Sequence, residues 1–242
     1  MANEPTHLRV LISGGFSGAY ERLLPEFERV SGIKVATASG ASQGKGPQTI
    51  AAQLVRGDPA DVVILSREGL TELIVANRIA AGTDVDLARV PLGIAVAAGA
   101  GLARSDVVGA AALGAVMLKA KAVAVPASTS GIWLTTVLFQ RLGIADRINV
   151  KMMPRGTDAT RAVADGAADV GVLPVSEIAH DAGVVLAGRL APEIQFIQTF
   201  SAAVVARSKQ VAAAKRLIAF LASVEASEAI AKSGMEPLAV SK

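Results

Sequence analysis

The chain has 242 residues, of which 52% are hydrophobic and 19% are charged, and its net charge is +3. A chain of this length and composition buries a sizeable core, which excludes disorder for its bulk. The absence of cysteine excludes disulfides, thiolate metal sites and cysteine nucleophiles. Because aromatic residues are few and no Lys/Arg run occurs, we expect no nucleic-acid partner.

Membrane and targeting signals are absent from the sequence as given. The most apolar stretch, residues 91–102, is too short to span a bilayer, so we expect no direct membrane insertion. Residues 1–6 have neither the basic region nor the apolar core of a leader peptide. We expect a periplasmic location if a leader precedes this sequence in the natural gene, and a cytoplasmic location otherwise.

Apolar runs typical of strands alternate with amphipathic runs typical of helices along the whole chain. Strands are predicted at 8–12, 33–37, 61–65, 92–98, 122–125, 149–153 and 169–173, with extended segments at 184–186 and 194–206. Helices are predicted at 20–30, 47–56, 67–77, 106–119, 132–142, 159–167, 212–222 and 225–232. This alternation predicts an α/β protein with largely parallel sheets.

One internal echo points to two similar lobes. Residues 54–65 and 163–173 each read as the end of a helix, a glycine turn, an Ala-Asp pair and an apolar strand. Helix–turn–strand units look alike in many proteins, so coincidence is an equal alternative.

Four loops that follow predicted strands are rich in glycine, serine and threonine, namely 13–17, 39–46, 126–131 and 155–157. Ligands of open parallel sheets bind beyond the carboxyl ends of the strands. Three of these loops lead into a helix, and Ser17 is a plausible N-cap of the first. Since free N–H groups at a helix start attract negative charge, the loops together predict a site for a small anion.

Lys45 and Arg155 are the basic side chains in these loops. A carboxylate ligand would favour them, Arg155 as a bidentate fork and Lys45 as a point charge. Arg67 and Lys151 are nearby alternatives as the ligand-binding cation. Each of these basic residues could equally be a solvated surface charge with no ligand.

Other chemical motifs are not matched. Residues 13–18 lack the dinucleotide-binding glycine pattern, residues 43–46 lack the spacing of a P-loop, and residues 15–19 miss the nucleophile elbow. The two histidines lie in unrelated segments and no metal-ligand spacing occurs, so we expect neither a metal nor a cofactor.

Several phrases resemble one protein family across nearly the whole chain. They are Ser13–Phe16, Gly57–Leu65, Ser128–Gly131, Arg141–Asp146, Val175–Ile178 and Ser233–Pro237. These segments resemble solute-binding proteins similar to the periplasmic molybdate-binding protein of ABC transporters.

The resemblance implies a type II periplasmic-binding-protein fold of two lobes, each a mostly parallel sheet flanked by helices. It places one discontinuous lobe at 1–92 and 200–242, the other at 93–199, and two crossover hinge segments near 89–97 and 194–206. The implied function is capture of a small anion in the inter-lobe cleft by a monomer, for uptake through the membrane component of an ABC transporter.

The family's molybdate site matches this chain only in part. Its first serine falls at Gly15, between Ser13 and Ser17, and its second falls near Ser42, beside an apparent insertion at 44–47. Its third and fourth positions fall near Ser130 and Gly156, and its ligand tyrosine falls at Pro174. These departures favour an organic di- or tricarboxylate over molybdate. The ligand-binding residues predicted from the loops and the resemblance are Ser13, Gly14, Gly15, Phe16, Ser17, Ser42, Gln43, Lys45, Ser128, Thr129, Ser130, Gly131, Arg155, Gly156 and Pro174.

An enzyme of the same fold is the alternative. Aconitate isomerase is similar to this family, and the Ser-Gly-Gly-Phe opening is similar to that branch. Its reaction, an allylic proton shift in a tricarboxylic acid, needs a base, a proton donor and charge stabilisation. His180, Glu177 and Lys45 are candidate bases, and the sequence does not choose among them.

Overall fold

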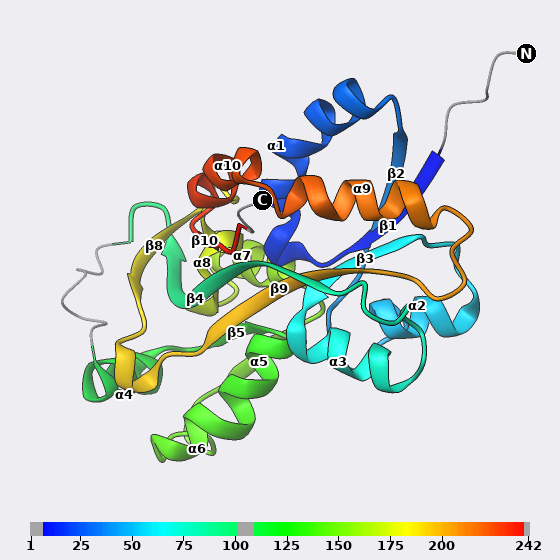
Figure 1. Ribbon diagram of the computed structural model, residues 1–242. Coiled ribbons are helices and arrows are strands. Elements are labelled where there is room, and N and C mark those ends of the chain that lie inside the picture. The colour runs from blue at the N-terminus through cyan, green and yellow to red at the C-terminus, as the bar shows by residue number, and fades with distance from the viewer. Residues whose placement is uncertain (1–6, 101–108, 240–242) are drawn as a thin grey trace, which may run out of the picture. The chain divides into compact units, whose positions relative to one another are not determined.

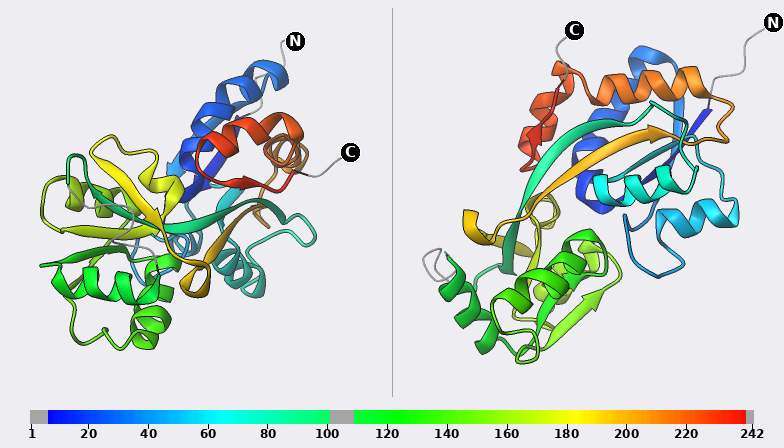
Figure 2. Two further views of the ribbon diagram at one scale, coloured as in Figure 1. Left: turned by 90° about the vertical axis from the view of Figure 1, so that its left-hand side faces the viewer. Right: turned by 60° about the horizontal axis from the view of Figure 1, so that its bottom comes forward.

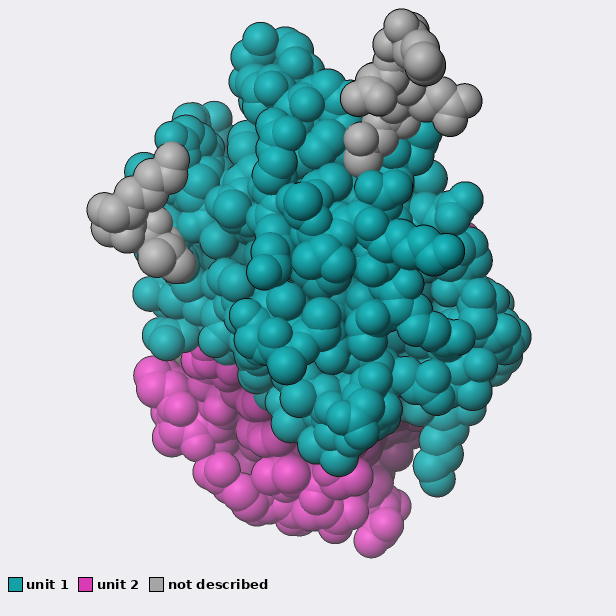
Figure 3. Space-filling view, turned by 45° about the vertical axis from the view of Figure 1, so that its right-hand side comes forward, with its two compact units in different colours: residues 1–89, 199–242 teal, residues 90–198 magenta. Residues whose placement is uncertain are grey.

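The computed structural model describes residues 7–100 and 109–239 (Figure 1). The chain divides into two compact units, one made of residues 1–89 and 199–242 and the other of residues 90–198 (Figure 3). The fold is the mixed α/β fold of type II periplasmic binding proteins. Of the predicted helix 106–119, residues 106–108 lie outside the described residues.

Unit 1 is built on a sheet with the strand order β2-β1-β3-β9-β4. These strands are β1 (His7–Ile12), β2 (Lys34–Ser39), β3 (Val62–Ser66), β4 (Val85–Ala97) and β9 (Ile197–Val204), and β10 (Glu236–Pro237) pairs with β4. β1 is parallel to both β2 and β3, whereas β9 is antiparallel to β3. The three parallel strands therefore end at one edge of the sheet.

Helices cover both faces of the sheet in unit 1 (Figures 1 and 2). The first face carries α1 (Gly14–Ser31), α9 (Val211–Leu221), the 3₁₀ turn η4 (Val224–Ala226) and α10 (Ser227–Lys232). The second carries α2 (Ile50–Arg56) and α3 (Arg67–Val75). Alternate strand residues point to opposite faces, so Leu11, Val63 and Leu65 join one buried cluster with Leu54 and Leu70 of these two helices.

Unit 2 repeats this plan around a parallel trio of strands. β5 (Val123–Pro126) lies between β6 (Val150–Met153) and β7 (Val170–Pro174), and it is parallel to both. The second half of β4 pairs antiparallel with β7 and with β8 (Val184–Arg189). The helices are α4 (Ala110–Lys119), α5 (Thr129–Trp133), the π-helix η2 (Leu134–Leu138), α6 (Phe139–Arg141), α7 (Gly156–Ala164), α8 (Val175–Ile178) and the 3₁₀ turn η3 (Pro192–Ile194).

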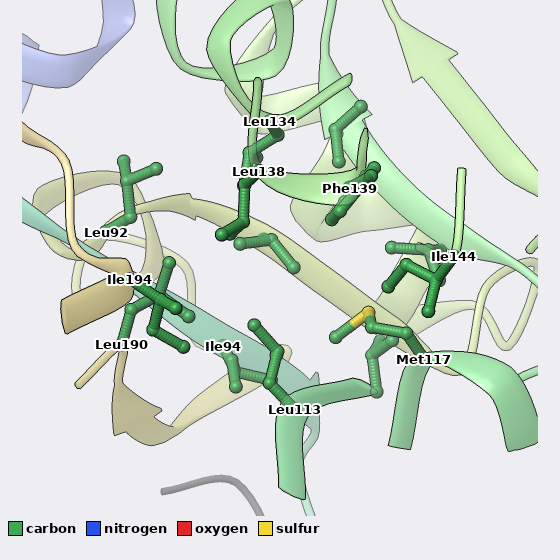
Figure 4. Close-up of a cluster of buried hydrophobic side chains, with 14 of the residues drawn as sticks. Leu92, Ile94, Leu113, Met117, Leu134, Leu138, Phe139, Ile144, Leu190 and Ile194 are labelled. Carbon is green, nitrogen blue, oxygen red and sulfur yellow. The ribbon is translucent and has the colours of Figure 1, made fainter. Parts of the chain in front are cut away.

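The larger core of unit 2 lies between its sheet and the α4–α6 helices (Figure 4). Leu113 and Met117 of α4 belong to the same buried cluster as Leu138 and Phe139, and all four are at most 1% exposed. On the opposite face, small side chains such as Ala159 let α7 lie close to the strands. This close approach brings the first turn of α7 near the ends of β5 and β7.

The echo between residues 54–65 and 163–173 marks equivalent places in the two units. α2 leads into β3, which lies between the central parallel strand β1 and the antiparallel strand β9. α7 leads into β7, which lies between the central parallel strand β5 and the antiparallel strand β4. Both turns need a left-handed glycine, with φ of 89° at Gly57 and 71° at Gly166.

Several helices differ from the sequence prediction in their bounds, and three of the differences bear on the loops. Ser13, not Ser17, is the N-cap of α1, because Ser13 is extended and the helix begins at Gly14. The helix predicted from residue 47 begins at Ile50, after Thr49 caps it through Ala52 N–H. The helix predicted at 132–142 is α5, a π-helical turn and α6. Thr136 Oγ1 donates to Ile132 O at 2.7 Å there, a side-chain bond typical of distorted helices.

Candidate functional site

The strand ends of unit 1 bring three loops together at the carboxyl edge of its sheet. Ser13 N–H donates to Ile64 O at 2.8 Å, and Gly40 N–H donates to Ile12 O at 2.9 Å. Ser66 N–H donates to Ser42 Oγ at 3.0 Å. The predicted loops after β1 and β2 are thus joined to the loop after β3.

Among the polar groups at this edge, Ser13 is the best candidate for a ligand contact. It caps the N-terminus of α1, its side chain is 4% exposed, and its buried Oγ has no hydrogen-bond partner among the described residues. A buried hydroxyl without a partner is costly unless a ligand or water satisfies it. Its position at a helix start suits a negatively charged ligand.

Gly15 and Phe16 have structural roles. A Cβ atom on Gly15 would lie 2.1 Å from Cζ of Phe200, so glycine is needed there to let the ring approach. Phe16 is fully buried, and its ring centroid lies 6.4 Å from that of Phe200. Gly14 is exposed, and Ser17 Oγ donates to its carbonyl oxygen at 2.7 Å within α1.

The loop after β2 holds its predicted residues differently. Ser42 is 4% exposed and bonded to Ser66, while Gln43 Nε2 donates to Glu72 Oε1 at 2.5 Å. Lys45 is exposed and forms no ion pair among the described residues. Lys45 is therefore the predicted cation of unit 1 that is available to an anion.

Ser66 lies at the same edge of the sheet and was not named by the sequence prediction. It is fully buried at the end of β3, caps α3 by accepting from Gly69 N–H at 3.2 Å, and bonds Ser42. The signal was a serine directly after an apolar strand, the same pattern that singled out Ser13.

Arg67, named as an alternative cation, is already paired. Its guanidinium donates to Asp84 Oδ2 at 2.8 Å and to Asp86 Oδ1 at 2.8 Å. Asp86 also accepts from Ser201 Oγ at 2.6 Å. The hydrogen bond from Arg67 lowers the pKa of Asp84, which keeps that carboxylate ionised and the arginine engaged.

Unit 2 gathers its loops in the same way. Ala127 N–H donates to Met153 O at 2.6 Å, which joins the loops after β5 and β6. Ser128 is the N-cap of α5, and Thr129 and Ser130 are 4% and 3% exposed in its first turn. A Cβ atom on Gly131 would lie 1.8 Å from Pro126 O, so this glycine serves the packing of α5 against its strand.

Arg155 is the N-cap residue of α7, and its side chain forms an ion pair with Asp158. Its Nε lies 3.1 Å from Asp158 Oδ2, and the arginine side chain is 52% exposed. Such an exposed pair contributes only about 0–1 kcal/mol, so Arg155 can turn to a ligand at little cost. Lys151, the second alternative cation, donates to Ala167 O at 2.7 Å.

The loop after β7 adds an acid to this edge. Pro174 is the buried last residue of β7, and α8 begins at the next residue. In α8, Glu177 Oε2 and Ser176 Oγ are buried and have no hydrogen-bond partner within the described ranges. Burial raises the pKa of Glu177 from 4.5 to about 7. Gly156, at the start of α7, lies against this carboxyl group.

A cavity of about 850 Å³ lies elsewhere in unit 1, at the edge where β1 and β3 begin. Its lining includes His7, Asp61, Arg78 and Lys209, and none of the predicted site residues. Within residues 7–100 and 109–239, no group of three His, Asp or Glu side chains could hold a metal ion. In the same ranges, no helix combines the length and apolarity needed to cross a bilayer.

The two α/β units, each with serine- and glycine-rich helix starts at the carboxyl edge of its sheet, have the fold of type II periplasmic binding proteins. The chain belongs to the bacterial extracellular solute-binding protein family, whose model matches residues 8–236. It is 33% identical over 241 residues to an aconitate isomerase of a Pseudomonas species, covering 98% of this chain and 91% of that protein.

Solved structures share the fold at low sequence identity. The sulfate-binding protein SubI of Mycobacterium tuberculosis is 20% identical with a TM-score of 0.74, covering 96% of this chain and 87% of that one. The periplasmic molybdate-binding protein of Azotobacter vinelandii is 19% identical with a TM-score of 0.71, covering 94% of this chain and 98% of that one.

Proposed function

We propose that this protein binds a small organic anion, a di- or tricarboxylate, in the periplasm and delivers it to an ABC-type uptake system. The family to which it belongs supports a small ligand and a transporter partner. Each unit has helix starts whose N–H groups suit carboxylate oxygens, at Ser13 in unit 1 and at Ser128 and Arg155 in unit 2. Each unit also has a cation suited to a carboxylate, Lys45 in unit 1 and Arg155 in unit 2.

The observation that carries the choice of ligand is the contact between Gly15 and Phe200. The molybdate pattern places a serine at Gly15, yet a Cβ atom there would lie 2.1 Å from the ring of Phe200. A hydroxyl-bearing side chain at position 15, as expected for a compact oxyanion, would therefore have to displace the Phe200 ring. A ligand with separate carboxylate groups depends less on that one hydroxyl and more on the cations.

A thermal-shift panel tests this proposal. The protein is heated with molybdate, sulfate, citrate, tricarballylate, and cis- and trans-aconitate at equal ionic strength. A ligand at about 100 times its Kd stabilises the folded state by about 2.7 kcal/mol, which corresponds to a rise in Tm of about 5–10 °C. We expect that rise with at least one tricarboxylate. The proposal would be contradicted if only molybdate raised Tm, or if none of the anions raised it.

Lys45→Ala separates a specific site from general charge effects. Loss of a charge-assisted contact of about 1.5–3 kcal/mol weakens carboxylate binding by about 10- to 150-fold. Lys215→Ala is the matched control, because Lys215 is also exposed in unit 1 but lies on α9. Equal losses in the two variants would mean that the effect is general electrostatics.

The second candidate function is isomerisation of an unsaturated tricarboxylic acid. The 33% identity with an aconitate isomerase across 98% of this chain favours it. Incubation with pure trans-aconitate, followed by proton NMR, distinguishes the two functions. Appearance of cis-aconitate at a rate proportional to protein concentration supports the isomerase. Binding without conversion supports transport alone.

A further inference from the structure

Glu177 is an acid held in an unusual setting. Although part of the residue is exposed, its Oε2 atom is buried and accepts no hydrogen bond from any described residue. The neighbouring Ser176 is 5% exposed, and its Oγ also lacks a partner there. Two adjacent buried polar groups without partners are rare in folded proteins, and such groups are retained where they serve a ligand or a reaction.

Gly156 fixes the place of this acid. A Cβ atom on Gly156 would lie 1.3 Å from Glu177 Oε2 and 2.2 Å from its Cδ, so the carboxyl group occupies the volume that a side chain would fill. Gly156 is the first residue of α7, whose N-terminus belongs to the carboxyl edge of the sheet in unit 2. The acid is thus held beside the loops that carry the predicted ligand-binding residues of this unit.

Both protonation states of Glu177 are accessible near neutral pH. Burial favours the neutral acid and raises its pKa to about 7. The N-terminus of α7 acts in the opposite direction, since a helix start stabilises a carboxylate. A group that takes a proton from a substrate and returns it works best when its pKa is near the operating pH.

The other charged groups on the packed elements are less suited to this task. At the start of α7, the N-cap residue Arg155 pairs with Asp158. After α8, Asp181 accepts from Thr160 Oγ1 at 2.6 Å and from Gly183 N–H at 2.9 Å, which lowers its pKa and keeps it ionised. His180 is exposed and engaged in an interaction of its own.

We propose that Glu177 is the proton-transferring residue of an allylic isomerisation of an unsaturated tricarboxylate. The proposal rests on the second candidate function. The carboxylate removes a proton from the methylene carbon, and the C–H electron pair forms the new C=C bond. The electron pair of the old C=C bond then takes the same proton from the acid at the far carbon. Bonds, electrons and the proton balance without a co-reactant.

Glu177→Gln tests the proposal, because glutamine keeps the shape and cannot carry the proton. Interconversion of cis- and trans-aconitate is measured by NMR for the wild type, Glu177→Gln and the control Glu193→Gln. The control removes the charge of an exposed glutamate in the same unit. We expect kcat to fall by about 10²- to 10⁴-fold in Glu177→Gln, while Glu193→Gln is unchanged. The thermal shift with trans-aconitate should persist in both variants.

The outcomes separate this proposal from the function on which it rests. If the wild type converts aconitate and Glu177→Gln keeps its rate, Glu177 is not the proton carrier and the isomerase stands. If the wild type converts nothing, both the isomerase and the role of Glu177 are overturned, whatever the variants do. Should Glu177→Gln fail to fold, the wild-type profile of kcat decides: a rise to a plateau through about pH 7 is expected, and a flat profile overturns the proposal.

Discussion

Replacing Gly156 with alanine should destabilise the protein, although alanine is the better helix former. The new methyl group would lie 1.3 Å from Glu177 Oε2 and 2.2 Å from Cδ, so the carboxyl group must be displaced. Overpacking of this kind costs about 1–3 kcal/mol. At about 2–4 °C per kcal/mol for a chain of this size, Tm should fall by about 2–12 °C.

The effect of Gly156→Ala on stability should change from destabilising to stabilising when Glu177 is removed. In a Glu177→Ala background the methyl group has space, and Gly→Ala at a compatible position stabilises by about 0.4–1 kcal/mol. Urea unfolding of the four proteins of this double-mutant cycle measures the coupling, which should be about 1.5–4 kcal/mol. Additive effects, or a Gly156→Ala variant as stable as the wild type, would refute the packing of Glu177 on Gly156.

Three other predictions use the same kinds of measurement. Gly15→Ala should cost about 1–3 kcal/mol in urea unfolding, because its methyl group meets the Phe200 ring, and Phe200→Leu should reduce that cost; an unchanged cost would contradict this reason. Ser66→Ala should cost about 1 kcal/mol through the lost cap of α3, whereas no loss of Tm would contradict the capping role. The pKa of Glu177 in the folded protein, about 7, lies above its ordinary 4.5, so the folded state binds a proton more tightly than the unfolded state. The free energy of unfolding should therefore fall by about 3 kcal/mol as pH rises from 4.5 to 7. Glu177→Gln should lack this pH dependence, and parallel curves of unfolding free energy against pH for the two proteins would contradict the prediction.

The alternation of strands and helices was readable because apolar periodicity reports burial directly. The strands and helices around Leu11, Val63 and Leu65 follow from their spacing alone. Helix boundaries were harder to predict, because they depend on which of several small residues lies outside the helical conformation. Ser13 and Ser17 are both good caps by type, and pairing of Ser13 N–H with Ile64 O decides between them.

The sequence predicted which loops form the candidate site, but not the role of each residue in those loops. Glycine and serine at strand ends mark turns, helix starts and ligand contacts alike. The sequence could not reveal that Gly15 makes room for Phe200, or that Gly131 makes room for the carbonyl of Pro126, because those partners are distant in sequence or set by the fold. It named Glu177 among three possible bases, but the burial that distinguishes it arises only in three dimensions.

The cations illustrate the same limit. Lys45, Arg155 and Arg67 are all basic residues near strand ends, yet Arg67 is engaged by Asp84 and Asp86 while Lys45 has no ion pair among the described residues. Pairing across the sheet is a tertiary property, so sequence spacing did not predict it. The structure therefore narrows which cations a ligand can use.

Isothermal titration calorimetry of the wild-type protein with trans-aconitate and with molybdate, in the same buffer, tests the central claim most directly. The proposed function predicts saturable binding of the tricarboxylate with one site per chain, and weaker or no binding of molybdate. Tight binding of molybdate with no heat from the tricarboxylate would contradict it.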